Sequence, residues 1–449
     1  MRMFTIIAVM LTGSLLSTAQ PFTTLRVPGQ YKTIQAAVNA AQSHDLVLVS
    51  PGVYRETVDT TRANRIGVKL VSTDGPLVTI IDGGGKGPVV TLQDGPLEGF
   101  TVTNGSTPYN GGGILVTHRS SWPSGWVKGC IITGNQAAMG GGGFHGSANL
   151  INNVITRNHT SGNGGGAHLL DRNKEVVGNV IHDNTAGMNG GGLFLQTCST
   201  SLILENSVFH NACTGTGGGI HIENQSTIPV VNTILWNNKA GKAGLEMYAA
   251  TGSMTTLRHC VVKGGKAGVA FDGTSIVILG PGILDADPLF VDPAGGDCHL
   301  RARSPCFQAG DTSFNRPYRL DFTDFEGDPR IALDAIDIGV DEFHPHLYVT
   351  GDATPGKDID VKAVGPPGVD VVWGLSLHPA PLANPVILPG LGGLYLQPPL
   401  VLVPLGRTNR DGLAVLQVRI PPTLPVPRLF PGQALIGYGL SNLERISVQ

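Results

Sequence analysis

Four side chains recur at one position of a repeated sequence pattern, and their types could support chemistry. Runs of three glycines end at Gly113, Gly143, Gly166, Gly192 and Gly219. The second residue after the last four runs is His145, His168, Phe194 and His221, and Glu223 follows two residues later. Neutral imidazoles can bind a metal or transfer protons, and flat rings can stack against sugars. These five residues are the candidate ligand-binding set, and no residue is identified as catalytic.

The four rings meet only if the repeats stack. The residue directly after each glycine run is apolar, as in Ile114 and Ile220, so strand alternation turns it inward and the next side chain outward. In stacked coils, His145, His168, Phe194 and His221 would then form one exposed column, called here the histidine column. The alternative is a covered or merely solvated column with a structural role.

A second marker supports stacking. An apolar-x-x-Asn pattern recurs with the residues Ile131, Val154, Val180, Val208, Ile234 and Val261, which are 23, 26, 28, 26 and 27 positions apart. Such a period is typical of a solenoid whose units cannot bury their apolar faces alone. Short strands turned by glycine and asparagine predict a parallel β-helix. Glycines can supply left-handed turns. The recurring asparagines (Asn135, Asn158, Asn184, Asn238) tolerate left-handed conformations, and their amides can bond in a ladder.

The N-terminal residues have two features of their own. Residues 1–19 combine an early arginine, a short apolar run and small residues, which predicts a signal peptide and export to the cell surface or medium. Ile34, Val38 and Ala41 then fall at helical spacing, so a short amphipathic helix is expected to close the end of the core.

Three stretches resemble known β-helix proteins. "TIQAAVNAAQSHDLVLVSPGVYRE" resembles the N-terminal segment of pectin-lyase-like right-handed parallel β-helix proteins, and the two repeat markers resemble those of polymorphic outer membrane proteins. Residues 285–311 with 324–343 resemble the end segment of secreted bacterial β-helix proteins. The resemblance covers about residues 25–345. It implies an all-β chain with a right-handed β-helix over 20–310 and an end segment over 311–346.

Residues 347–449 lack the repeat. No formal charge occurs from Trp373 to Gly406, but seven prolines in that stretch exclude a membrane-spanning helix. We expect a small C-terminal β-sandwich-like domain, and no membrane span after signal removal.

Cysteines and charge add further expectations. Export permits disulfides, and Cys298 and Cys306 are close enough in sequence to favour a bridge. The pairing of Cys130, Cys198, Cys213 and Cys260 stays open, with buried apolar roles as one option. A net charge of -3 without a basic block argues against nucleic acid as a partner.

The resemblance implies a choice between two functions. The superfamily includes lyases and hydrolases that act on polysaccharides, but this chain has no adjacent aspartates and few acidic residues between Glu98 and Glu246. We therefore expect an exported bacterial scaffold, monomeric and without cofactor or metal, that binds polysaccharide or another surface polymer. The alternative is a polysaccharide lyase or glycoside hydrolase that uses His145, His168, His221 and Glu223.

Overall fold

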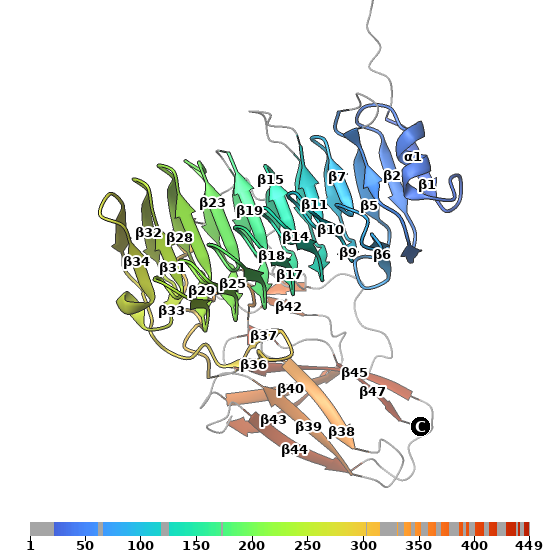
Figure 1. Ribbon diagram of the computed structural model, residues 1–449. Helices are drawn as coiled ribbons and strands as arrows, with labels where there is room; N and C mark the ends of the chain where they lie inside the picture. The colour runs from blue at the N-terminus through green and yellow to red at the C-terminus, as the bar shows by residue number, and fades with distance from the viewer. Residues whose placement is uncertain are drawn as a thin grey trace, which may run out of the picture.

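The computed structural model describes residues 22–61, 66–117, 125–171, 174–301, 303–314, 330 and 336–342, together with ten C-terminal strands between 346 and 448 (Figure 1). The expected signal peptide, residues 1–19, lies outside the described residues. Between Thr24 and Leu279 the chain winds as a parallel solenoid, in which each coil adds one strand to each of several sheets.

Three long sheets and one short sheet run along the rod. The first contains β1 (Thr24–Val27), β2 (Leu46–Val49), β5 (Lys69–Ser72), β8 (Leu97–Glu98), β12 (Trp126–Lys128), β16 (Asn149–Ile151), β20 (Glu175–Val177), β24 (Leu202–Leu204), β28 (Thr227–Val231), β32 (Met254–Arg258) and β35 (Ile276–Leu279). The second contains β3 (Gly52–Tyr54), β6 (Thr79–Asp82), β9 (Thr101–Thr103), β13 (Ile131–Thr133), β17 (Val154–Thr156), β21 (Val180–His182), β25 (Ser207–Phe209), β29 (Ile234–Trp236) and β33 (Val261–Val262).

The third and fourth sheets complete each coil. The third contains β4 (Val58–Asp59), β7 (Val90–Leu92), β11 (Ile114–Val116), β15 (Phe144–Gly146), β19 (Ala167–Leu170), β23 (Leu193–Gln196), β27 (Ile220–Glu223), β31 (Met247–Ala249) and β34 (Val269–Phe271). The fourth, of two-residue strands, contains β10 (Ser106–Thr107), β14 (Gln136–Ala137), β18 (His159–Thr160), β22 (Thr185–Ala186), β26 (Ala212–Cys213) and β30 (Lys239–Ala240).

The core consists of apolar side chains stacked at equivalent positions of successive coils. Ile132, Ile155, Ile181, Val208 and Leu235 lie in register on successive strands of the second sheet and are fully buried. Helix α1 (Ile34–Ala40) closes the N-terminal end by burying Ile34, Ala37 and Val38, and Thr33 caps it by accepting a bond from the Ala36 amide. The expected capping helix is confirmed.

Asparagine ladders run inside the corners. Asn135, Asn158, Asn184, Asn211 and Asn238 are joined by side-chain amide bonds of 3.0 Å from each coil to the next. A second ladder joins Asn153, Asn179 and Asn206. The ladder is confirmed, but its asparagines do not use the left-handed conformation that asparagine tolerates. The residue before each one takes the positive φ instead, as at Arg157 and Asp183, which leaves the ladder side chains pointing inward.

The glycine runs are tight turns. Gly164 has a φ of +73°, and a Cβ there would lie 2.9 Å from the Cβ of His168. A Cβ on the next residue, Gly165, would lie 2.4 Å from the carbonyl oxygen of Gly191 in the following coil. The first glycine is therefore needed for its backbone conformation and the second for the close approach of neighbouring turns.

The end segment folds back along the rod. The hairpin of β36 (Phe290–Asp292) and β37 (Asp297–Leu300) and residues 336–340 cover an apolar patch on the second sheet, where Phe209 and Ile234 pack with Phe290, Ile338 and Val340. Backbone bonds reinforce this packing, because Gly339 donates to the Asn232 carbonyl at 3.0 Å.

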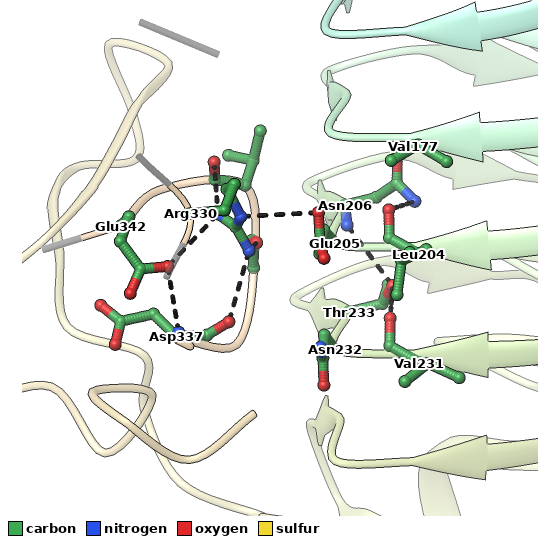
Figure 2. Close-up of polar contacts among 12 residues, drawn as sticks. Val177, Leu204, Glu205, Asn206, Val231, Asn232, Thr233, Arg330, Asp337 and Glu342 are labelled. Atoms are coloured by element: carbon green, nitrogen blue, oxygen red, sulfur yellow. Dashed lines mark hydrogen bonds and ion pairs between the residues drawn. The ribbon is translucent and has the colours of Figure 1, made fainter. Parts of the chain in front are cut away.

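A buried arginine holds the same segment in place (Figure 2). The Arg330 guanidinium donates to the carbonyls of Val340 at 3.0 Å and Gly339 at 2.9 Å, and its Nε lies 3.5 Å from Glu205 Oε2 on the rod. Its Nη1 lies 3.9 Å from Glu342 Oε2. Burial and the nearby Asp337 carboxylate raise the pKa of Glu342. We call Arg330, Glu205 and Glu342 the clasp.

The C-terminal strands form antiparallel sheets. One orders β38 (His346–Gly351), β39 (Asp358–Val364) and β44 (Leu413–Arg419). Another orders β43 (Leu400–Arg407), β40 (Asp370–Ser376), β45 (Arg428–Ile436) and β46 (Gly439–Leu440), with β47 (Glu444–Val448) beside β45, and β41 (Val386–Leu388) pairs with β42 (Gly392–Leu394). The C-terminal part is β-structured and differs in topology from the rod. Within the described residues, no helix is long and apolar enough to span a membrane.

Candidate functional site

The histidine column exists in the expected register. His145 pairs with His168, His168 with Phe194, and Phe194 with His221 on neighbouring strands of the third sheet. The ring centroids of these pairs are 4.7, 4.7 and 5.0 Å apart, and Tyr248 extends the stack at 5.4 Å. Stacking of the repeats therefore brings these distant residues into contact.

The expected exposure of the column is wrong. His145, His168, Phe194 and His221 are only 8%, 9%, 0% and 2% exposed. The glycine turns cover their outer side, since a Cβ on Gly140 would lie 2.8 Å from His168 Nδ1 and one on Gly217 would lie 2.8 Å from the His221 Cβ. The rings cannot serve as a platform for a polymer because the turns already occupy that space.

The electrostatics of the column agree with a structural role. Burial and the neighbouring His145 lower the pKa of His168 to about 3, so its imidazole is neutral. His221 Nε2 lies 3.5 Å from Glu223 Oε2, and the Gln196 amide donates to Glu223 Oε1 at 3.1 Å. Glu223 is partly exposed, and its carboxylate contacts both His221 and Gln196. In the described ranges, no group of three or more His, Cys, Asp or Glu side chains is arranged to hold a metal.

The expected disulfide is also wrong. All six cysteines lie in the described part of the chain, and none of them is bonded to another sulfur. Cys298 and Cys306 are instead packed as small apolar side chains with Phe290, Leu300 and Ile338. Burial raises the pKa of the Cys306 thiol to about 12, which disfavours the reactive thiolate. Proximity in sequence was therefore a poor guide to pairing.

The other four cysteines are buried, as the apolar option allowed. Cys130 occupies the position one coil before Asn153 in the second asparagine ladder, and the Cys130 amide donates to Asn153 Oδ1 at 2.9 Å. At the other end Thr233 follows Asn206, and Cys260 occupies the same position one coil later. Burial raises the pKa of both thiols to about 12.

A cleft at the corner after the second sheet offers a more accessible site. Its volume is about 670 Å³, and its chemically active lining residues are His210, Trp236, Lys239, Glu246, Lys263 and Asp285. The Lys263 ammonium lies 5.4 Å from the centre of the half-buried Trp236 ring, and it donates to the side chain of Asn237. The cleft thus combines an aromatic ring with charges of both signs, a combination that suits a polar ligand with flat apolar faces.

Strand ends and turns position these groups. Trp236 ends β29, and the left-handed Asn237 directly after it turns the chain into the corner. Lys263 follows β33, the next strand of the same sheet. Asp285 is exposed and accepts a bond of 2.8 Å from the Gly264 amide, which fixes its carboxylate beside the Lys263 turn.

Glu246 is the buried member of the cleft. It takes the place of the third glycine in its coil, because its carbonyl oxygen receives the Ile220 amide at 3.0 Å. Asn238 Nδ2 donates to its Oε2 at 2.6 Å, so Glu246 terminates the first asparagine ladder. Burial raises the pKa of Glu246 to about 7, although the bonds from Asn238 favour the carboxylate. A carboxyl group with this pKa can hold or release a proton near neutrality.

Sequence reasoning missed this cleft, although one signal was present. The glycine run that ends in Gly219 has no counterpart one coil later, where Gly244-Leu245-Glu246 stands instead. A charged residue at a position otherwise reserved for glycine marks a departure from the structural repeat, and such departures concentrate at functional sites.

Comparison with models of protein families agrees with the architecture. Residues 89–280 match the family model described as "Right handed beta helix region". No curated protein matches the chain by sequence. Among solved structures, the enzymatically active domain of tailspike protein 4 from bacteriophage CBA120 is similar at 9% identity and a TM-score of 0.24, with 92% of this chain and 65% of that chain covered. This chain therefore spans 65% of that domain's length, and so distant a likeness says nothing about activity. Residues 89–280 are thus a right-handed β-helix region.

Proposed function

We propose that the protein is an exported, non-catalytic β-helix scaffold that binds a polysaccharide or another surface polymer in the cleft around Trp236. The observation that carries this proposal is the half-buried Trp236 ring in an open cleft with Lys239, Lys263 and Asp285. Sugar rings stack on indole faces while their hydroxyls bond to charged groups at the rim. The histidine column, being covered, has no part in this binding.

The pectin-lyase-like superfamily, the polymorphic-outer-membrane-protein-like repeats and the secretion-type end segment remain inferences from sequence resemblance, as does a sandwich arrangement of the C-terminal sheets. The resemblance to secreted proteins supports the same proposal, because an exported protein would meet such polymers outside the cytoplasm. Cell fractionation of the native host checks this placement: the protein is expected in the medium or on the surface, and a cytoplasmic pool with residues 1–19 retained would contradict export.

Glycan-array binding with the purified full chain tests the ligand class. Trp236→Ala is expected to lower the affinity at least tenfold for whichever glycan binds the wild type. Trp126→Ala is the matched control, because Trp126 is an exposed indole on the first sheet whose Nε1 donates to Glu98 at 2.5 Å. Equal losses in the two variants, or no binding by the wild type to any polymer on the array, would contradict the proposal.

A second candidate is a polysaccharide-degrading enzyme that uses the same cleft. The observation that favours it is the pair of carboxyl groups, Glu246 with a pKa of about 7 and the exposed Asp285. Glycoside hydrolysis needs one protonated and one ionised carboxyl group. Release of reducing ends or of unsaturated product by the wild type, and its loss in Glu246→Gln with binding retained, would favour the enzyme over the scaffold.

A further inference from the structure

The two ends of the rod differ in how the core is closed (Figure 1). Helix α1 covers the N-terminal end. At the other end, β34 and β35 are the last strands of two sheets, whereas Leu284 bridges β33 and the short 3-10 helix η2 (Gly265–Gly268) packs beside it. The inward positions of this last coil are only half-buried at Val269, Val277 and Leu279. Their partners one coil earlier, Met247, Thr255 and Leu257, are buried. The core is therefore open beside β34 and β35.

The open end also has a strand edge that lacks the usual protection against pairing with another strand. β35 reads Ile-Val-Ile-Leu without charge or proline, and Ile276 and Ile278 are 55% and 47% exposed. Phe271, on β34, is 52% exposed. Natural sheet edges are usually protected by lysine, proline, a bulge or a covering element. The edge strand at the other end, β1, has Arg26 and lies beside α1.

Backbone groups on β35 point to the open side. The amides of Ile276 and Gly280 donate to the preceding coil, at 2.9 Å to Ser253 and 2.8 Å to Leu257. Because peptide groups alternate in direction along a parallel strand, the amides of Val277 and Leu279 face away from the rod. Whatever covers this end must therefore present strand backbone as well as an apolar surface.

We propose that two copies of the chain associate end to end through this last coil. A single peptide could pair with one sheet, but another copy of this coil offers the edges of two sheets, those of β34 and β35, around one apolar core at the same time. Beside β34 the last coil has one cation, Lys266, and one carboxylate, Asp272, so two copies meet without strong repulsion. Since α1 covers the opposite end, association stops at a two-fold dimer and forms no filament. This proposal differs from the monomer that is expected from the sequence.

Sedimentation velocity of the full chain over a dilution series tests this inference. The wild type is expected to sediment as a dimer that dissociates on dilution. Ile276→Lys and Ile278→Lys are each expected to weaken association at least tenfold, while Val53→Lys, which changes an exposed residue of β3 near the opposite end, leaves it unchanged. A monomer at every concentration, larger open-ended assemblies, or dimers of equal strength in the Ile variants would overturn the proposal.

Hydrogen exchange supplies a readout that needs no variant. The amides of Val277 and Leu279 are expected to exchange slowly in concentrated protein and quickly in dilute protein, while Ile276 stays protected in both. Identical exchange at the two concentrations would also overturn the dimer. Glycan binding by Ile278→Lys is expected to persist, so failure of the dimer and failure of the polysaccharide proposal are distinguishable.

Discussion

Asn238 and Glu246 are joined at the point where the first asparagine ladder ends. Asn238 Nδ2 donates to Glu246 Oε2 at 2.6 Å, so a carboxyl group accepts the bond that another asparagine carbonyl accepts in earlier coils. The ladder is thereby satisfied at its last member, and the cleft gains a buried acid. One side chain thus serves both the fold and the candidate site.

The first prediction concerns pH and Glu246. Its pKa is raised from 4.5 to about 7 in the folded protein, so folding favours the protonated acid. The associated stability is present below about pH 4.5 and is lost as the pH rises through 7, by about 3 kcal/mol. Glu246→Gln should remove this slope in urea unfolding measured across that range. Asp285→Asn, which changes the exposed carboxylate, should leave the slope as in the wild type. An unchanged slope in Glu246→Gln would show that this pH dependence does not come from Glu246.

The second prediction concerns acid and His168. Because burial lowers its pKa from 6.5 to about 3, the stability that depends on a neutral imidazole is present above pH 6.5 and is lost as the pH falls toward 3. The loss is about 1.4 kcal/mol per pH unit. His168→Phe, which copies the next ring of the column, should flatten the acid side of a pH–stability profile. His159→Phe, at an exposed site, is the control, and a similar effect of both substitutions would count against the explanation.

The third prediction concerns the clasp. Arg330→Met leaves the buried Glu205 carboxylate without its cation, and removal of one partner of a buried ion pair typically costs about 3–5 kcal/mol. Hydrogen exchange should then accelerate over residues 336–342, which the Arg330 donors hold. Arg55→Met, which removes a largely exposed cation 3.9 Å from Asp82, should change the unfolding free energy by no more than about 0.5 kcal/mol. Unchanged exchange in Arg330→Met would show that the clasp does not hold the segment.

The fourth prediction concerns the ladder. In Asn184→Ala, the amide of Asn158 loses its acceptor and the side-chain carbonyl of Asn211 loses a donor, all in a buried corner. Each unsatisfied group costs about 1–3 kcal/mol. Thermal unfolding should therefore shift to clearly lower temperature, whereas Asn39→Ala on the exposed side of α1 should have little effect. Equal midpoints for the two variants would mean that the ladder contributes little.

The fifth prediction concerns the thiols. Alkylation of the unfolded protein without reductant, followed by mass spectrometry, should label both Cys298 and Cys306. If these cysteines were alkylated only after reduction, the result would show that the disulfide is present. Folded protein should react slowly, because both side chains are buried.

Several parts of the structure could be predicted from local patterns. The coil period, the stacking of His145 on His168, the capping helix with Ile34 and Val38, and the ladder that includes Asn158 all depend on residues within one repeat or on the same position in the next. A solenoid repeats its contacts from coil to coil, so sequence alignment of the repeats is sufficient to find neighbours.

The exposure and the pairing of other residues depended on contacts between repeats and on chain segments outside the repeats. His168 is covered because a glycine turn folds over it, and alternation along the strand gives no information about what lies above an outward side chain. Cys298 and Cys306 are close in sequence, but the packing of Phe290 and Ile338 determines where their sulfurs lie. The cleft could not be predicted from the repeat, because it forms where Glu246 interrupts the glycine runs and where the chain brings Asp285 beside it.

The sequence alone therefore determined the winding of the chain and which positions stack, because short repeats of similar length bury their apolar faces by stacking on one another. Only the tertiary structure decided which of those positions reach solvent. Burial depends on what the turns and the returning end segment place over each sheet, and those contacts join residues that share no position in the repeat.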